Sequence, residues 1–163
     1  MPEGIKTNKE AVAEAIENNV RKKIIKEHLI DPAYFEEMSK LLNEVIKERK
    51  AKAINYEEYL KKIAELSKKV SNATRDDLPN EIKTNAQRAL YHNLGNNELL
   101  ALRIDEVVKK VKKSDWRGKL PKENEIKAEM LQILKEKDEV ERLFSIIKQQ
   151  SEYWYATDII GQY

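Results

Sequence analysis

The sequence predicts an all-α fold, with about seven amphipathic helices packed as an irregular helical bundle. Apolar residues recur three or four positions apart along most of the chain, which is the spacing of one helix face. Residues that favour helix starts precede several of these stretches. The 163 residues include only 4 glycines and 4 prolines, which is few for a protein rich in loops or strands.

The N-terminal half is predicted to contain three helices. The first runs from about Asn8 to Leu29, and Asp31 followed by Pro32 marks the start of the second, because aspartate favours the N-cap and proline the first helical position. Asn55, with Glu58 three residues later, predicts a capping box for the third. The predicted apolar faces are Val12, Ala13, Ile16, Val20, Ile24 and Ile25; then Tyr34, Phe35, Met38, Leu41, Leu42, Val45 and Ile46; then Leu60, Ile63, Leu66 and Val70, with Ile54 and Tyr59 as a hydrophobic staple.

The C-terminal half is predicted to contain four helices after a connection from Ser71 to Glu81. Thr84 and Gln87 form a capping-box pattern, and Gly95 is placed to end that helix in the left-handed conformation. A break from Ser114 to Pro121 follows the fifth helix. The predicted apolar faces of the last three helices are Leu99, Leu100, Ile104, Val107, Val108 and Val111; Ile126, Met130, Ile133 and Leu134; and Val140, Leu143, Phe144 and Ile147.

The chain is predicted to form one helical domain over residues 8–153, with an N-terminal tail at 1–7 and an aromatic-rich tail at 154–163. The connection at 71–81 allows a subdivision into two helical halves. We favour one domain because each half alone would have a thin core.

Composition limits the classes of function. The chain has no cysteine, which excludes disulfides and thiolate metal sites, and its net charge of +2 does not by itself indicate a nucleic-acid partner. No apolar run approaches the roughly 20 residues of a membrane span, and the N-terminus lacks the pattern of a signal peptide. We therefore expect a cytoplasmic protein with no membrane partner and no small-molecule substrate.

No catalytic, cofactor or metal site can be assigned from the sequence. Gly118-Lys119 lacks the upstream glycine and the Ser or Thr of a phosphate-binding loop, and His28 and His92 lack a second histidine at helical spacing. The triplet Glu48-Arg49-Lys50 has the spacing of a nuclease motif but lies at a helix end with no strand around it. Such triplets arise by chance when 37% of residues are charged.

A basic segment at 109–122 is the strongest charged feature. It contains seven basic residues against one acid, Asp115, which could serve to contact phosphates. The alternative is a solvated helix end, because lysines in a last turn interact favourably with the helix dipole. The basic residues are Lys109, Lys110, Lys112, Lys113, Arg117, Lys119 and Lys122.

Two tryptophans offer a choice between a core and an interface. Trp116, beside Arg117 in a predicted loop, could anchor a partner, although we favour a place in the core of the bundle. Trp154, between Tyr153 and Tyr155, could either fold back on the domain or form an adhesive patch.

Several stretches resemble the C-terminal helical region of type I restriction enzyme R subunits. The more specific stretches are Glu-Asn-Asn-Val-Arg-Lys-Lys-Ile at 17–24 and Asp-Trp-Arg-Gly at 115–118. The resemblance covers roughly residues 8–153 and continues through Asp31-Pro32-Ala33-Tyr34, Ile54-Asn55-Tyr56-Glu57-Glu58-Tyr59-Leu60 and Arg88-Ala89-Leu90-Tyr91.

The resemblance implies a non-catalytic docking domain. In such systems the parent subunit is an ATP-dependent DNA translocase and endonuclease that uses ATP and Mg²⁺, and its helical end is expected to attach it to the methyltransferase and specificity subunits. None of the nuclease or ATPase motifs of that family lies in this chain, so we expect it neither to cleave DNA nor to hydrolyse ATP alone. The alternative function is a DNA-contacting module that uses residues 109–122.

Overall fold

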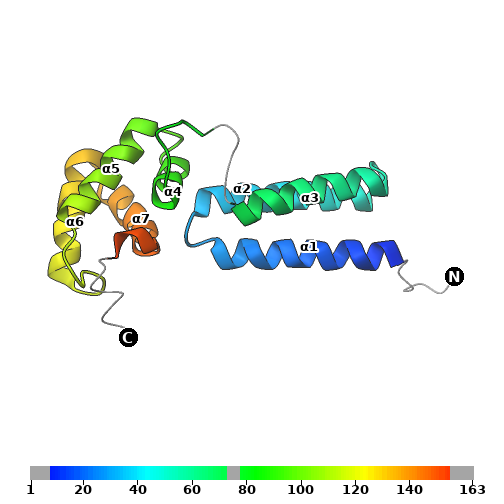
Figure 1. Ribbon diagram of the computed structural model, residues 1–163, viewed down its shortest axis with the longest axis horizontal. Helices are drawn as coiled ribbons and strands as arrows, with labels where there is room; N and C mark the ends of the chain where they lie inside the picture. Colours follow the sequence, from blue (N-terminus) through cyan, green and yellow to red (C-terminus); the bar gives the residue numbers. More distant parts are fainter. Residues whose placement is uncertain (1–7, 73–77, 155–163) are drawn as a thin grey trace. The chain divides into compact units, whose positions relative to one another are not determined.

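The protein is all-helical wherever its structure is described. The computed structural model describes residues 8–72 and 78–154, and these contain seven α-helices and a short 3₁₀-helix (Figure 1). The all-α prediction is therefore confirmed. The elements are α1 (Asn8–Glu27), α2 (Pro32–Lys50), α3 (Tyr56–Asn72), α4 (Asn85–Asn93), α5 (Glu98–Val111), α6 (Leu120–Leu134), α7 (Lys137–Lys148) and η1 (Ser151–Tyr153).

The chain divides into two compact units. Unit 1 comprises Met1–His28 and Tyr34–Asp77, and unit 2 comprises Leu29–Ala33 and Leu78–Tyr163. The main junction between them therefore lies inside the connection at 71–81 where the sequence allows a subdivision. The predicted tail at 1–7 lies outside the described residues, as do residues 73–77 and all of the predicted tail at 154–163 except Trp154.

Unit 1 is a three-helix assembly in which α1, α2 and α3 share one apolar core. The backbones of α1 and α3 approach each other more closely than either approaches α2. Ala13 and Tyr59 explain the close approach, since the small Ala13 lets the Tyr59 hydroxyl donate to its carbonyl at 3.0 Å. The buried core of unit 1 consists of Ala13, Val20, Ile24, Tyr34, Phe35, Met38, Leu42, Tyr59, Ile63, Leu66 and Val70.

The buried face of α1 differs from the predicted one. Val12 and Ile25 are 44% and 68% exposed, while Glu17 is buried beside Ala13, Val20 and Ile24. Residues spaced strictly by four drift about 40° per step around a helix with 3.6 residues per turn. The observed buried residues Ala13, Glu17, Val20 and Ile24 have spacings of four, three and four, which keep them on one face of the helix. That face therefore includes Glu17.

The start of α3 is as predicted, and its buried face differs from the predicted one only in its first residue. The Asn55 side chain accepts a hydrogen bond from the Glu58 backbone N–H at 2.8 Å, as an N-cap does. Tyr59, predicted as part of the staple, leads the buried stripe, whereas Leu60 is an exposed residue. The stripe is Tyr59, Ile63, Leu66 and Val70.

Unit 2 is built from four helices around a larger core. Helix α4 packs against α5 and α7, α5 packs against α6, and α6 packs against α7, so the four form a closed set of neighbours. Leu99, predicted to face the core, is 80% exposed at the start of α5. The buried core consists of Ile82, Ala86, Ala89, Leu90, Ala101, Ile104, Val108, Trp116, Ile126, Met130, Val140, Leu143, Phe144, Ile146, Ile147 and Tyr153.

Local signals place both ends of α4. Thr84 and Gln87 form the predicted capping box, with the Gln87 N–H donating to the Thr84 hydroxyl at 3.1 Å. Gly95 follows the helix with a φ of +64°, the left-handed conformation that was predicted for it. Two distant residues add to these caps: Glu152 accepts from the Ala86 N–H at 2.7 Å, and Arg142 donates to the Asn93 carbonyl at 2.7 Å.

The predicted break at 114–121 begins and ends two residues earlier in the structure. Helix α6 begins at Leu120 and includes Pro121 in its first turn. Proline is compatible with a first turn because its missing N–H has no partner within the helix. Pro121 therefore belongs to the helix start, and the break covers the residues from Lys112 to Lys119.

None of the helices within 8–72 and 78–154 combines the length and apolar character needed to cross a membrane.

Candidate functional site

The basic segment at 109–122 carries less available charge than its sequence suggests. Lys109 pairs with Asp105 at 3.0 Å, Lys113 pairs with Glu125 at 3.0 Å, and the Lys122 ammonium donates to the Ser114 carbonyl at 2.7 Å. Lys112 is buried, while Lys110 and Lys119 are exposed. Helix α5 thus pairs Lys109 with its own Asp105, and α6 brings Glu125 next to Lys113.

Arg117 is used to hold the end of α7. Its Nε donates to the Lys148 carbonyl at 3.0 Å and its Nη2 donates to the Gln150 carbonyl at 2.6 Å. The guanidinium also lies over the rings of Trp116 and Trp154, at 4.4 and 4.6 Å from their centroids. Arg117 therefore satisfies backbone carbonyls that the helix itself leaves open.

Trp116 lies in the core of unit 2, as we favoured from the sequence. Its side chain is fully buried, packs edge-on against Phe144 and donates from Nε1 to the Tyr153 carbonyl at 3.0 Å. Trp154 is half-buried against Arg117. The motif Asp-Trp-Arg-Gly thus ties the chain after α7 to the rest of unit 2.

Asp105 is a second polar centre of unit 2. Its carboxylate accepts from the Tyr153 hydroxyl at 2.7 Å and from the Gln87 amide at 3.0 Å, in addition to the Lys109 ammonium. Burial, with the negative charge of Asp105, raises the pKa of Tyr153 well above its usual value, so its hydroxyl stays a donor. The arrangement is a fixed hydrogen-bond network.

The two histidines occupy different settings. His28 lies 3.6 Å from Glu36 on the surface. His92 is buried in unit 2, where its Nδ1 lies 2.6 Å from the Asp31 carboxylate, which also accepts from the Asn93 amide at 2.8 Å. Among residues 8–72 and 78–154, no group of three or more metal-ligating side chains is arranged to hold an ion.

The residues of the Glu48-Arg49-Lys50 triplet point to separate partners. Glu48 pairs with Lys62 on α3 at 2.7 Å, whereas Arg49 binds Glu17 on α1 through two hydrogen bonds of 2.7 and 3.2 Å. The hydrogen bond with Glu17 raises the pKa of Arg49, and burial of Tyr59 beside them raises the pKa of that phenol. Glu48 and Arg49 are thus engaged in holding the helices of unit 1 together.

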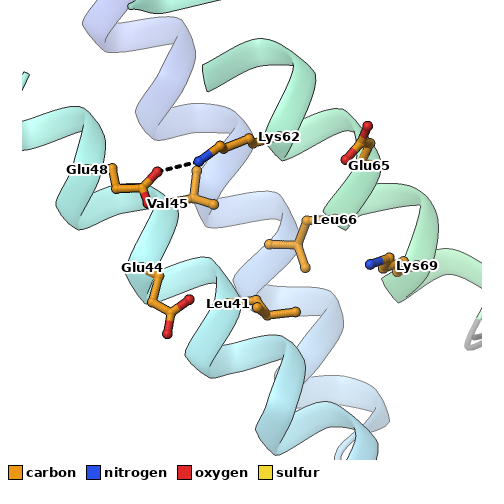
Figure 2. Close-up of a pocket in the computed structure, with 8 residues that line it drawn as sticks. All are labelled: Leu41, Glu44, Val45, Glu48, Lys62, Glu65, Leu66 and Lys69. Atoms are coloured by element: carbon orange, nitrogen blue, oxygen red, sulfur yellow. Dashed lines mark hydrogen bonds and ion pairs between the residues drawn. The ribbon is translucent and has the colours of Figure 1, made fainter. Parts of the chain in front are cut away.

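Among the described residues, a groove of about 200 Å³ lies between α2 and α3 (Figure 2). Each helix contributes one ridge of residues at helical spacing, and the apolar side chains Leu41, Val45 and Leu66 point into the gap between the ridges. The groove is smaller than the 300–1,000 Å³ or so of most small-molecule pockets. Its size suits one or two aliphatic side chains better than a cofactor. The charged residues along its edges are Glu44 and Glu48 on α2 and Lys62, Glu65 and Lys69 on α3.

The distance between the backbones of α2 and α3 creates this groove. Large side chains such as Tyr34, Phe35 and Met38 fill the space between α2 and the other two helices. The backbone of α2 is therefore farther from α3 than the backbone of α1 is. The Tyr34 hydroxyl fixes the spacing by donating to the Lys69 carbonyl on α3 at 2.9 Å. Leu41 and Val45, about two and three turns beyond Tyr34 along α2, remain only partly buried at the mouth of the gap.

One ion pair closes one end of the groove. The Lys62 ammonium reaches across to Glu48, as the dashed line in Figure 2 shows. The hydrogen bond to Glu48 is the main cause that raises the pKa of Lys62, and the charge of Glu58 adds to it. Glu44 and Glu65 remain on opposite edges of the groove, one from each helix.

Sequence reasoning missed this groove. Leu41, Val45 and Leu66 all fall in the predicted apolar faces, and nothing in their spacing separates a core position from a groove position. The carboxylates of α2 fall in an acidic stretch from Asp31 to Glu48, which by itself is typical of a solvated helix face.

Comparison with protein-family models, with curated proteins and with solved structures gave no match to this chain.

Proposed function

We propose that this chain is a helical docking domain whose function is to bind another protein. The observation that carries the proposal is the α2/α3 groove, in which an apolar floor remains accessible between charged edges of both signs. Grooves of this kind receive an amphipathic helix, with the floor providing affinity and the edges providing orientation. The rest of unit 1 is tied together by the buried Glu17–Arg49 pair, which favours a preformed surface.

We further propose that the partner is the methyltransferase–specificity core of a type I restriction system. The support for this step is the sequence resemblance at 17–24 and 115–118. Within the second of these stretches, Trp116 and Arg117 hold the chain that follows α7 against the rest of unit 2. The resemblance assigns ATP and Mg²⁺ to other domains of the parent subunit, so no residue of this chain is assigned to them.

DNA contact through residues 109–122 is the second candidate. The exposed Lys110 and Lys119 favour it, but Asp105 and Glu125 neutralise their neighbours Lys109 and Lys113. A protein that neutralises several phosphates shows a steep loss of affinity with salt. A duplex-binding constant that changes little with salt, or with Lys110→Ala and Lys119→Ala together, would exclude this function.

Co-purification tests the docking function. The tagged chain should retain a purified methyltransferase–specificity complex on a column, and a parent R subunit truncated before Asn8 should fail to assemble. Failure of the chain to bind, combined with normal assembly of the truncated parent, would contradict the proposal.

A further inference from the structure

We propose that the α2/α3 groove binds a basic amphipathic helix, with an aliphatic side chain on the floor and lysine or arginine residues beside it. This inference deepens the docking function and rests on it. It identifies the chemical class of the partner segment and the residues that select it.

The floor defines the central side chain of the partner. Leu41, Val45 and Leu66 offer only carbon atoms to the gap, and a volume of about 200 Å³ admits one or two side chains of leucine size. Burial of such a side chain removes apolar surface from water on both partners. Two parallel ridges with a gap between them are the surface into which the ridge of a third helix packs.

The edges define the charge of the partner. Glu48 and Lys62 already satisfy each other at 2.7 Å, which leaves Glu44, Glu65 and Lys69 to face an incoming helix. Glu44 and Glu65 lie on opposite sides of the floor (Figure 2), so a helix between them has a carboxylate on each flank. Basic residues three or four positions from the aliphatic side chain complement both.

The same charges disfavour other occupants. Phosphate groups would meet Glu44 and Glu65 at both edges, so a nucleic acid is a poor fit. An acidic helix would meet like charges, which cost affinity and slow association. A second copy of the chain would have to present a basic ridge between the carboxylates of Glu44 and Glu65.

The test uses the full chain and a labelled synthetic helix. The probe is an alanine-based peptide of about 18 residues, roughly five helical turns, with a leucine ridge and flanking lysines. A matched probe carries glutamates in place of the lysines. Fluorescence anisotropy measures the affinity of each probe for the wild-type chain and for its variants.

Two variants report on the edges and on the floor separately. Glu44→Lys with Glu65→Lys reverses both flanking charges and should weaken the lysine probe about tenfold. Val45→Phe fills the floor without changing the charge and should weaken it as well. The control Glu81→Lys with Glu106→Lys makes the same charge change at exposed positions of unit 2, and should leave the affinity unchanged. Circular dichroism confirms that each variant is folded.

The outcomes are distinct. Equal binding of both probes, or equal loss in the edge variant and its control, overturns the inference. Concentration-dependent dimerisation that the edge variant abolishes also overturns it, because the occupant is then a second copy. If the lysine probe fails but the chain and its edge variant still retain the methyltransferase–specificity complex, the groove inference is wrong while the docking function stands.

Discussion

The guanidinium of Arg49, near the end of α2, holds the buried carboxylate of Glu17 on α1 through two hydrogen bonds. The same guanidinium lies 5.6 Å from the ring centroid of Tyr59, which belongs to α3. One side chain thus links all three helices of unit 1. This contact explains how α1 tolerates a glutamate on its buried face.

Removal of Arg49 should destabilise unit 1 more than an exposed ion pair would. Arg49→Met leaves the Glu17 carboxylate buried without its cation, which costs about 2–3 kcal/mol of unfolding free energy. Arg49→Lys should lose less, since it keeps the charge but cannot make both hydrogen bonds. Urea unfolding followed by far-ultraviolet circular dichroism measures both. In the double variant Glu17→Met with Arg49→Met most of the stability should return, and a double variant as unstable as Arg49→Met would contradict this account.

Substitution of Arg117 should destabilise unit 2 through lost backbone contacts. Arg117→Met removes the donors to the Lys148 and Gln150 carbonyls and should cost about 1–3 kcal/mol. The fluorescence of Trp116 and Trp154 reports this unfolding, because the two tryptophans of the chain both belong to unit 2. Lys119→Met, at an exposed position in the same segment, serves as the control and should change the midpoint little.

Replacement of Gly118 should destabilise unit 2 through the backbone conformation at this position alone. Its φ is +78°, and a Cβ built at this position meets no atom within 4 Å. Gly118→Ala should therefore cost about 1 kcal/mol from backbone strain, without a steric clash. Gly118→Asn should cost less, since asparagine enters the left-handed region more readily than alanine. Equal losses of unfolding free energy for both variants in a urea titration would show that the cost does not come from the positive φ of Gly118.

The stability of unit 2 should fall at acid pH through Glu123. Burial opposes ionisation of this carboxyl, but hydrogen bonds from the Gly118 N–H at 2.9 Å and from Lys148 at 3.2 Å outweigh it and lower its pKa below 4.5. A carboxyl with a lowered folded pKa stabilises the protein above its unfolded pKa, and that stability is lost as the pH falls through the folded value. Unfolding free energies between pH 6 and pH 3 should therefore decline less steeply for Glu123→Gln than for the wild type. Identical slopes would show that Glu123 is not responsible.

Local signals made the helices predictable, whereas their faces and partners depended on tertiary contacts. The starts of α3 and α4 follow from Asn55 and Thr84, whose side chains bond to the backbone three residues later. The core position of Trp116 agreed with the interpretation that we favoured. By contrast, the pairing of Lys113 depended on Glu125, which lies on another helix, α6; the pair of Lys109 with Asp105 is a local one within α5, four residues apart. The groove depended on how far α2 stands from α3, which no local pattern encodes.

The assignment of Leu29–Ala33 to unit 2 has a consequence for dissecting this chain. These five residues lie in the sequence between the two segments of unit 1, but they contact unit 2. The Asp31 carboxylate contacts His92 and Asn93, and the Ile30 carbonyl accepts a hydrogen bond from the Gln150 amide at 2.8 Å. A fragment that starts at Leu78 would lack the Asp31 carboxylate that contacts His92 and Asn93 and the Ile30 carbonyl that contacts Gln150. Separate expression of the C-terminal part therefore calls for the fusion of residues 29–33 to the fragment, or for their addition as a short peptide, to complete unit 2.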